Sequence, residues 1–196
     1  MKALIIVDIQ NDFLDGGSLA VPNGNEVIPL INEIQNDFDL IVATQDWHPH
    51  NHKSFAAEHP NQQEFDLIDL NGLPQVLWPI HCVQGSFGAE FHQDLETNKI
   101  EAIFRKGMDT EIDSYSGFYD NGKRKNTGLL GYLKDRNVTD VSVVGLAADY
   151  CVYFTAKDAL EAGFQTEIIE KATRPISLNN WKNLKEEFKN LGGIIS

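Results

Sequence analysis

Six short apolar runs divide this chain, and polar or amphipathic stretches separate them. The runs are Leu4–Val7, Leu40–Ala43, Ala102–Phe104, Val141–Leu146, Glu167–Ile169 and Ile194–Ile195. The first, second and fourth runs are continuous rather than alternating, which is typical of strands that are covered on both faces. Strands of this kind occur in parallel sheets, so this feature constrains the fold more than any other.

Amphipathic segments lie between the apolar runs. The segments with a helical apolar stripe are Asn25–Asn36, Thr127–Arg136, Tyr150–Glu161 and Leu178–Asn190. Alternation of strands and helices predicts a parallel sheet with right-handed crossovers. We therefore expect an α/β fold of three layers, α/β/α, around a central, mostly parallel sheet of six strands.

Residues 45–100 interrupt this alternation, because they are rich in His, Pro, Asn and Gln. A loop of that length inside a compact domain is usually functional. The chain contains no internal repeat, low-complexity tract or linker. We expect a single domain, residues 1–196, with a loop-rich insertion at about 45–100.

The charge balance limits the partners that the chain can have. Lys and Arg number 16 against 29 Asp and Glu, so the formal net charge is -13. Such a surface repels phosphate backbones and anionic lipids, which disfavours nucleic acid and membrane as partners. No apolar stretch approaches the ~20 residues of a membrane-spanning helix, and the first run is too short for a signal peptide. We expect a cytoplasmic protein, as a monomer or homo-oligomer, that binds a small molecule.

Side chains that can carry out chemistry follow the ends of the predicted strands. Asp8 follows the first strand, and Asp46 and His48 follow the second. Lys106 follows the third strand, and the segment after the fourth leads to Cys151. In open parallel sheets, ligands bind at the carboxyl ends of the strands. We therefore expect these residues to lie on one edge of the sheet.

Cys151 is the candidate nucleophile. Two cysteines are too few for a disulfide scaffold, so each is expected to be a free thiol. Cys151 is expected in the first turn of the helix at 150–161, where exposed N–H groups and the macrodipole favour a thiolate. Asp8 could accept the thiol proton, and Lys106 could hold Asp8 ionised and stabilise the thiolate. The alternative is that Cys151 is a buried packing thiol.

A second group combines Asp46 and His48 with His81. One carboxylate and two imidazoles suit Zn²⁺, Fe²⁺ or Mn²⁺, with positions left open for water or substrate. The neighbouring imidazoles that leave the ligand set open are His50, His52 and His59. We interpret Cys82, next to His81, as a structural thiol, because neighbouring side chains in an extended segment point apart.

Seven segments together resemble the nicotinamidases, also called pyrazinamidases, of the isochorismatase-like cysteine hydrolase superfamily. The segments that carry the resemblance are Ala3–Phe13, Thr44–Pro49, His52–Phe55, Trp78–Val83, Lys106–Gly107, Asp113–Phe118 and Val144–Val152. Each is moderately specific alone, and their combination in this order is very specific. One departure is Ala148, where many bacterial relatives carry Thr.

The resemblance implies roles for individual residues. The implied catalytic triad is Asp8, Lys106 and Cys151. The implied ligands of one divalent metal ion, zinc with Fe²⁺ or Mn²⁺ as alternatives, are Asp46, His48 and His81. The implied groups that orient these ligands are His52 and Ser54, although some relatives recruit a further direct ligand from this stretch.

The resemblance also implies an oxyanion hole and a pocket for a pyridine ring. A cis peptide bond before Ala147 would turn the N–H groups of Ala147 and Cys151 toward one point. The aromatic walls would be Phe13, Trp78 and Tyr115, for which the alternative is ordinary core packing.

The implied activity is hydrolysis of nicotinamide, and also of pyrazinamide, to the acid and ammonia. It would proceed through a thioester on Cys151 with the pyridine nitrogen held by the metal, and would serve NAD salvage. Two alternatives remain open. One is a related amidohydrolase for a carbamoyl or ureido substrate, which would not need the metal site. The other is a non-catalytic metal-binding member of the fold.

Overall fold

Six parallel strands form the central sheet in the computed structural model, which describes every residue from Met1 to Ser196. The strands are β1 (Lys2–Val7), β2 (Leu40–Asp46), β5 (Ala102–Lys106), β6 (Asp140–Leu146), β7 (Gln165–Arg174) and β8 (Ile194–Ile195). Their order is β5-β2-β1-β6-β7-β8, and every neighbouring pair is parallel. The six apolar runs of the sequence all lie in these strands, so the predicted α/β sheet is confirmed.

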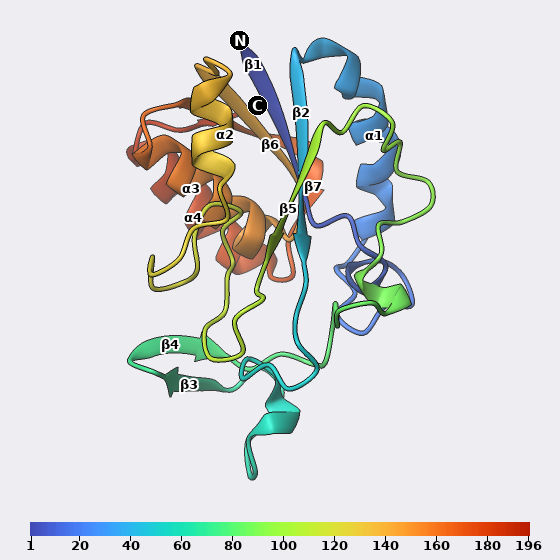
Figure 1. Cartoon of the computed structure of the whole chain (residues 1–196), viewed down its shortest axis with the longest axis vertical. Helices are drawn as coiled ribbons and strands as arrows, with labels where there is room; N and C mark the ends of the chain where they lie inside the picture. The colour runs from blue at the N-terminus through green and yellow to red at the C-terminus, as the bar shows by residue number, and fades with distance from the viewer.

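Helices cover both faces of this sheet. They are α1 (Val27–Ile34), α2 (Leu129–Asp135), α3 (Tyr153–Glu161) and α4 (Leu178–Asn190). Figure 1 shows α1 on one side of the sheet and α2, α3 and α4 on the other, which gives the predicted three layers. Successive side chains of a strand point to opposite faces. Ile5 and Ile6 of β1 therefore enter the two different cores. None of the helices combines the length and the apolarity needed to cross a bilayer.

The position of each strand explains its hydrophobic pattern. The central strand β1 is buried from Ala3 to Val7, and β2 is buried along its whole length. Strand β5 lies at the edge of the sheet, where its burial alternates and Ile103 is 50% exposed. Continuous apolar runs thus mark the strands with a layer on each side.

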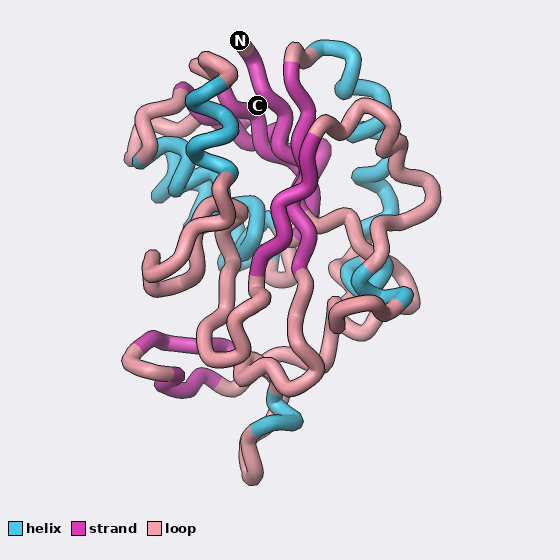
Figure 2. Tube along the Cα trace, in the orientation of Figure 1, coloured by secondary structure: helices cyan, strands magenta, loops and turns pink.

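The chain between β2 and β5 is mostly loop, as Figure 2 shows. It contains an antiparallel hairpin of β3 (Leu67–Leu70) and β4 (Leu73–Val76), which lies beyond the carboxyl end of the sheet in Figure 1. The sequence analysis did not predict this hairpin. Its two strands have only four residues each, too few to give a clear apolar pattern.

We expect Ile5→Ala to lower the free energy of unfolding by about 3 kcal/mol, because Ile5 is fully buried and its loss leaves a cavity. The matched control is Ile103→Ala on the exposed edge strand, which should cost less than about 1 kcal/mol. Urea denaturation followed by circular dichroism measures both values. Equal losses would contradict the assignment of β1 to the centre of the sheet.

Candidate active site

Asp8, Lys106 and Cys151 meet at the carboxyl end of the sheet. Asp8 directly follows β1, Lys106 is the last residue of β5, and Cys151 lies in the turn after β6. The Nζ atom of Lys106 lies 2.9 Å from Oδ2 of Asp8 and 3.4 Å from Sγ of Cys151. All three side chains are buried. The structure therefore brings together the three residues that the strand ends predicted.

The ammonium group of Lys106 also contacts Asp46, with Nζ 2.7 Å from Oδ1. Burial alone would lower the pKa of Lys106, but the carboxylates of Asp46 and Asp8 outweigh it and hold this pKa well above its usual range. Burial likewise opposes ionisation of Asp46, but Lys106 and His48 hold the pKa of Asp46 well below its usual range. Lys106 and Asp46 are consequently a charged pair inside the protein.

Asp8 is placed to accept a proton. Its Oδ1 accepts a hydrogen bond of 2.6 Å from Thr44, and its Oδ2 lies 2.9 Å from the Lys106 ammonium. One carboxylate oxygen of Asp8 lies within 4.8 Å of the Cys151 sulfur. Burial raises the pKa of Asp8, and the charge of Lys106 opposes that shift. Asp8 thus has an affinity for a proton greater than that of an exposed aspartate.

The turn that carries Cys151 differs from the sequence prediction. Cys151 lies in a π-helical turn, Ala148–Val152, and α3 begins only at Tyr153. The predicted place in the first turn of a helix starting at residue 150 is therefore wrong. Burial raises the pKa of the Cys151 thiol well above its usual range, and Lys106 opposes this only in part. The peptide bond between Leu146 and Ala147 is cis, as the resemblance implied.

Asp46, His48 and His81 form a compact cluster beside this triad. Oδ2 of Asp46 lies 3.4 Å from Nε2 of His48 and 3.8 Å from Nε2 of His81. The Nδ1 atoms of the two rings lie 2.9 Å and 2.8 Å from the carbonyl oxygens of Gly107 and Pro79, respectively. A carbonyl oxygen only accepts, so each Nδ1 carries the proton and each Nε2 offers a lone pair to the cluster.

This donor set fits a divalent metal ion. Nε2 of His48 is buried and has no hydrogen-bond partner, which is costly for a polar atom unless a ligand satisfies it. A carboxylate and two imidazoles whose Nδ1 atoms are held by carbonyl groups match the usual outer-sphere support of a metal site. The three ligand atoms lie within 4.8 Å of one another.

Gly107 lets His48 approach. Its φ angle is +65°, and a Cβ atom at this position would lie 2.4 Å from the His48 ring. No other residue type could occupy this position and still offer its carbonyl to Nδ1 of His48. The Lys106–Gly107 pair therefore serves both the triad and the cluster.

His52 and Ser54 lie behind the cluster. Nδ1 of His52 and Oγ of Ser54 are 2.7 Å apart, and the His52 ring lies 4.4 Å from that of His48. Burial and the neighbouring His48 lower the pKa of His52 to about 4, so the ring is neutral at neutral pH. Its Nε2 has no hydrogen-bond partner. His52, Asp113 and His48 form a second group of possible metal ligands, which shares His48 with the first.

Asp113 was not among the predicted site residues, although it begins one of the segments that carry the resemblance. The other imidazoles lie outside both groups: His50 is exposed, and His59 contacts the Lys53 carbonyl oxygen at 2.7 Å.

Cys82 is buried in the core and belongs to neither group. Its φ angle of +47° shows that the backbone is not extended at Cys82. The prediction that its side chain points away from His81 because the segment is extended therefore rests on a wrong premise.

A pocket of about 20 Å³ lies between the triad and the cluster. Its lining includes Phe13, Trp78 and Tyr115, as predicted, together with Ala147 and Cys151. The lining residues that sequence reasoning missed are Leu19, Asp113, Tyr150 and Ile176. Asp113 and Tyr150 had a signal, because both lie in segments that carry the resemblance. Leu19 and Ile176 come from loops with no sequence pattern of their own.

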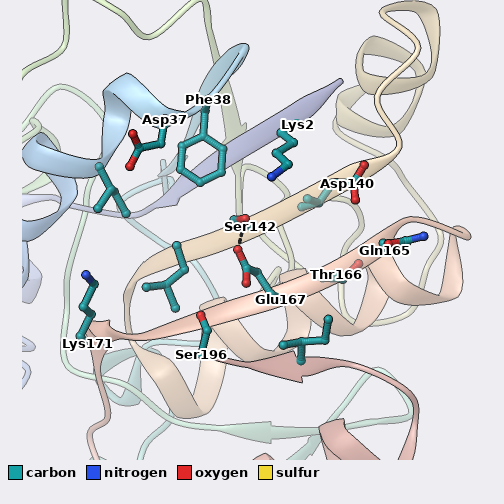
Figure 3. Close-up of a pocket in the computed structure, with 14 residues that line it drawn as sticks. Lys2, Asp37, Phe38, Asp140, Ser142, Gln165, Thr166, Glu167, Lys171 and Ser196 are labelled. Carbon is teal, nitrogen blue, oxygen red and sulfur yellow. Dashed lines mark hydrogen bonds between the residues drawn. The ribbon is translucent and has the colours of Figure 1, made fainter.

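A larger hollow, of about 610 Å³, lies at the opposite ends of the strands (Figure 3). Its lining includes Lys2 and Asp140, the first residues of β1 and β6, and Ser142, whose hydroxyl lies 2.5 Å from a Glu167 carboxylate oxygen. No cysteine or histidine lines it. Its side chains cannot supply a thiol nucleophile or imidazole ligands. The volume of a pocket therefore does not by itself identify the active site.

The chain is similar over its length to proteins of one family. The profile of the isochorismatase domain matches residues 2–196. A nicotinamidase from Acinetobacter baylyi is 50% identical over 177 residues, which cover 90% of this chain and 83% of that relative. The solved structure of an Acinetobacter baumannii nicotinamidase and pyrazinamidase has a TM-score of 0.96 at 47% identity and covers 99% of this chain and 94% of its own. The Pyrococcus horikoshii pyrazinamidase, solved in complex with zinc, has a TM-score of 0.82 at 37% identity, with 100% and 98% covered. The chain therefore belongs to the isochorismatase family, in the branch that contains the nicotinamidases.

Proposed function

We propose that this protein is a nicotinamidase that hydrolyses nicotinamide to nicotinate and ammonia, and also acts on pyrazinamide. The observation that carries the proposal is the contact of one buried ammonium group, that of Lys106, with Asp8 and the Cys151 thiol. The nicotinamidase names of relatives at 47% and 50% identity support it. The proposed setting is a cytoplasmic step that returns nicotinamide to NAD synthesis.

The proposed reaction begins with transfer of the Cys151 thiol proton to Asp8. Because burial raises the pKa of the Cys151 thiol, the thiol is protonated before the reaction. The thiolate forms as its proton moves to Asp8. The sulfur then bonds to the amide carbon, and Asp8 returns the proton to the departing nitrogen as ammonia. A thioester of Cys151 remains. Water, deprotonated by Asp8, bonds to the thioester carbon and breaks the C–S bond, and Asp8 passes the proton to the departing thiolate. The nicotinic acid that forms loses its remaining proton to solvent and leaves as nicotinate.

Two groups of the chain stabilise the charges that develop. The Lys106 ammonium, 3.4 Å from the sulfur, stabilises the thiolate. The backbone N–H groups of Ala147 and Cys151 are proposed to donate to the carbonyl oxygen as it becomes negative. An oxyanion donor of this kind contributes about 3 kcal/mol to lowering the barrier. Phe13, Trp78 and Tyr115 are proposed to hold the ring and exclude water.

Asp46, His48 and His81 are the proposed ligands of one divalent metal ion, with His52 and Ser54 orienting the site. We propose zinc, with Fe²⁺ or Mn²⁺ as alternatives, and the zinc complex of the Pyrococcus relative supports this choice. When bound, the metal supplies a Lewis-acid position for the ring nitrogen, which orients the substrate. The proposed role of the insertion at about 45–100, within one domain of residues 1–196, is to carry these ligands.

We expect the purified, reduced and metal-loaded protein to release ammonia from nicotinamide, and Cys151→Ala to reduce kcat at least 10⁴-fold, because it removes the nucleophile. The matched control is Cys82→Ala, which removes a thiol outside the site and should retain most of the activity. An enzyme-coupled ammonia assay measures both. Normal turnover by Cys151→Ala would refute the covalent mechanism. A wild-type protein that is inert toward nicotinamide would point to a carbamoyl or ureido substrate.

We expect Lys106→Met to lower kcat more than about 10²-fold and the free energy of unfolding by about 3–5 kcal/mol. The change leaves Asp8 and Asp46 buried without the cation that both contact. Lys157→Met, which removes a partly exposed ion pair with Glu187, should change either value little. Steady-state kinetics and urea denaturation measure the two effects. If Lys106→Met were as stable as the wild-type protein, the Lys106 cation would not be needed to keep the Asp8 and Asp46 carboxylates buried.

We expect His81→Ala to reduce the bound metal from about one ion per chain to less than about 0.2, because it removes one of three ligands. His50→Ala is the matched control, since this exposed imidazole lies outside the cluster and its loss should leave the metal content unchanged. Plasma emission spectrometry after dialysis against zinc measures the content. If His50→Ala lost the metal and His81→Ala retained it, the metal site would include His50 and would not be the Asp46, His48 and His81 cluster.

A further inference from the structure

The β3–β4 hairpin buries a polar side chain and exposes apolar ones. Gln75 is 2% exposed, whereas Leu67 of the same hairpin is 69% exposed. Every other residue of the two strands is at least partly exposed. An isolated two-stranded hairpin is marginally stable in water, so a buried amide is expected to have specific partners.

Gln75 donates to two groups of the active site. Its Nε2 lies 3.0 Å from Oδ2 of Asp113 and 3.1 Å from the hydroxyl oxygen of Tyr115. The same atom lies 2.7 Å from the carbonyl oxygen of Val76, so the two N–H groups of the amide are shared among three acceptors. The second oxygen of Asp113 accepts from the Ser114 N–H at 2.7 Å. Gln75 thereby ties the hairpin to one wall of the pocket.

Tyr115 belongs to a set of three rings around the pocket. Its ring centroid lies 6.2 Å from that of Trp78 and 5.4 Å from that of Tyr150, and the latter two are 4.8 Å apart. All three rings line the pocket of about 20 Å³ that Cys151 also lines. In so narrow a pocket, a small tilt of Tyr115 changes the space available to a planar ring. Gln75 itself does not line the pocket, so any effect it has passes through the residues it holds.

We propose that Gln75 is a positioning residue that fixes Tyr115 through its hydroxyl group and thereby sets the affinity of the pocket for the substrate ring. The proposal rests on the proposed nicotinamidase activity. Gln75 contacts neither Cys151, Asp8 nor Lys106 in the hydrogen bonds it forms, and the proton transfers do not involve it. It therefore acts on substrate binding and leaves the chemical step unchanged.

The test is Gln75→Met, which keeps an unbranched side chain of similar length and removes the N–H donors. We expect the KM for nicotinamide to rise about tenfold, the effect of losing a buried hydrogen bond that holds a binding group. The kcat and the rate at which iodoacetamide alkylates Cys151 should change less than about twofold. A merely structural role would instead lower kcat, alkylation and the melting temperature together.

The matched control is Ile68→Ala. Ile68 is the register partner of Gln75 across the hairpin, so its truncation loosens the same element and removes no hydrogen bond to the pocket. Its KM should stay within about twofold of the wild-type value, whatever its melting temperature. A rise in KM equal to that of Gln75→Met would show that any damage to the hairpin suffices and would overturn the proposal.

A double-mutant cycle with Tyr115→Phe tests the route of the effect. If Gln75 acts through the Tyr115 hydroxyl, adding Gln75→Met to Tyr115→Phe should change KM less than about twofold. Additive effects would overturn the proposed route, and an unchanged KM in Gln75→Met alone would overturn the proposal itself. A wild-type protein that releases no ammonia from nicotinamide would refute the proposed function first. The two failures are thus distinguishable.

Discussion

The buried ammonium group of Lys106 is the interaction on which the rest of the site depends. It lies 2.7 Å from Asp46, 2.9 Å from Asp8 and 3.4 Å from the Cys151 sulfur. Two carboxylates this close together could not both stay ionised in the core without a cation between them. Because Asp46 also faces the imidazoles of His48 and His81, one cation joins the proposed nucleophile and the proposed metal ligands into a single charge network.

The parallel sheet is what brings this network together. The strands that end at the site, β5, β2, β1 and β6, are consecutive neighbours. Asp46 and Lys106 are register partners on β2 and β5, so their side chains leave the sheet next to each other on the same face. Thr44, two residues earlier on β2, donates to Asp8 at the end of β1. An antiparallel neighbour would have carried its last residue to the opposite end of the sheet.

The parts of the structure that the sequence predicted are those governed by a repeating pattern. Short apolar runs located all six strands, and the predicted helix at Leu178–Asn190 has the same bounds as α4. The apolar runs did not extend to the polar ends of the strands. The second run stops at Ala43, whereas β2 continues to Asp46. The residues that end a strand at the site are polar, so they do not continue its apolar pattern. Gln75 and Asp113 could not be predicted, because a buried polar residue is recognisable only from its partners, and those lie 38 to 40 positions apart in the sequence.

Burial of the thiol gives a physical reason why the proposed metal site would assist the proposed nucleophile. The sequence suggested that a helix N-terminus would favour the thiolate, but Cys151 lies in a buried π-helical turn and its pKa is raised instead. Once Asp8 has taken the thiol proton, the negative charge of Asp46 and the positive charge of Lys106 cancel, so these neighbours give the thiolate no net positive charge. A divalent cation beside Asp46 would make the local net charge positive. On this argument a metal ion held by Asp46, His48 and His81 would lower the free-energy cost of the Cys151 thiolate, because opposite charges attract strongly in a buried site where water screens them little.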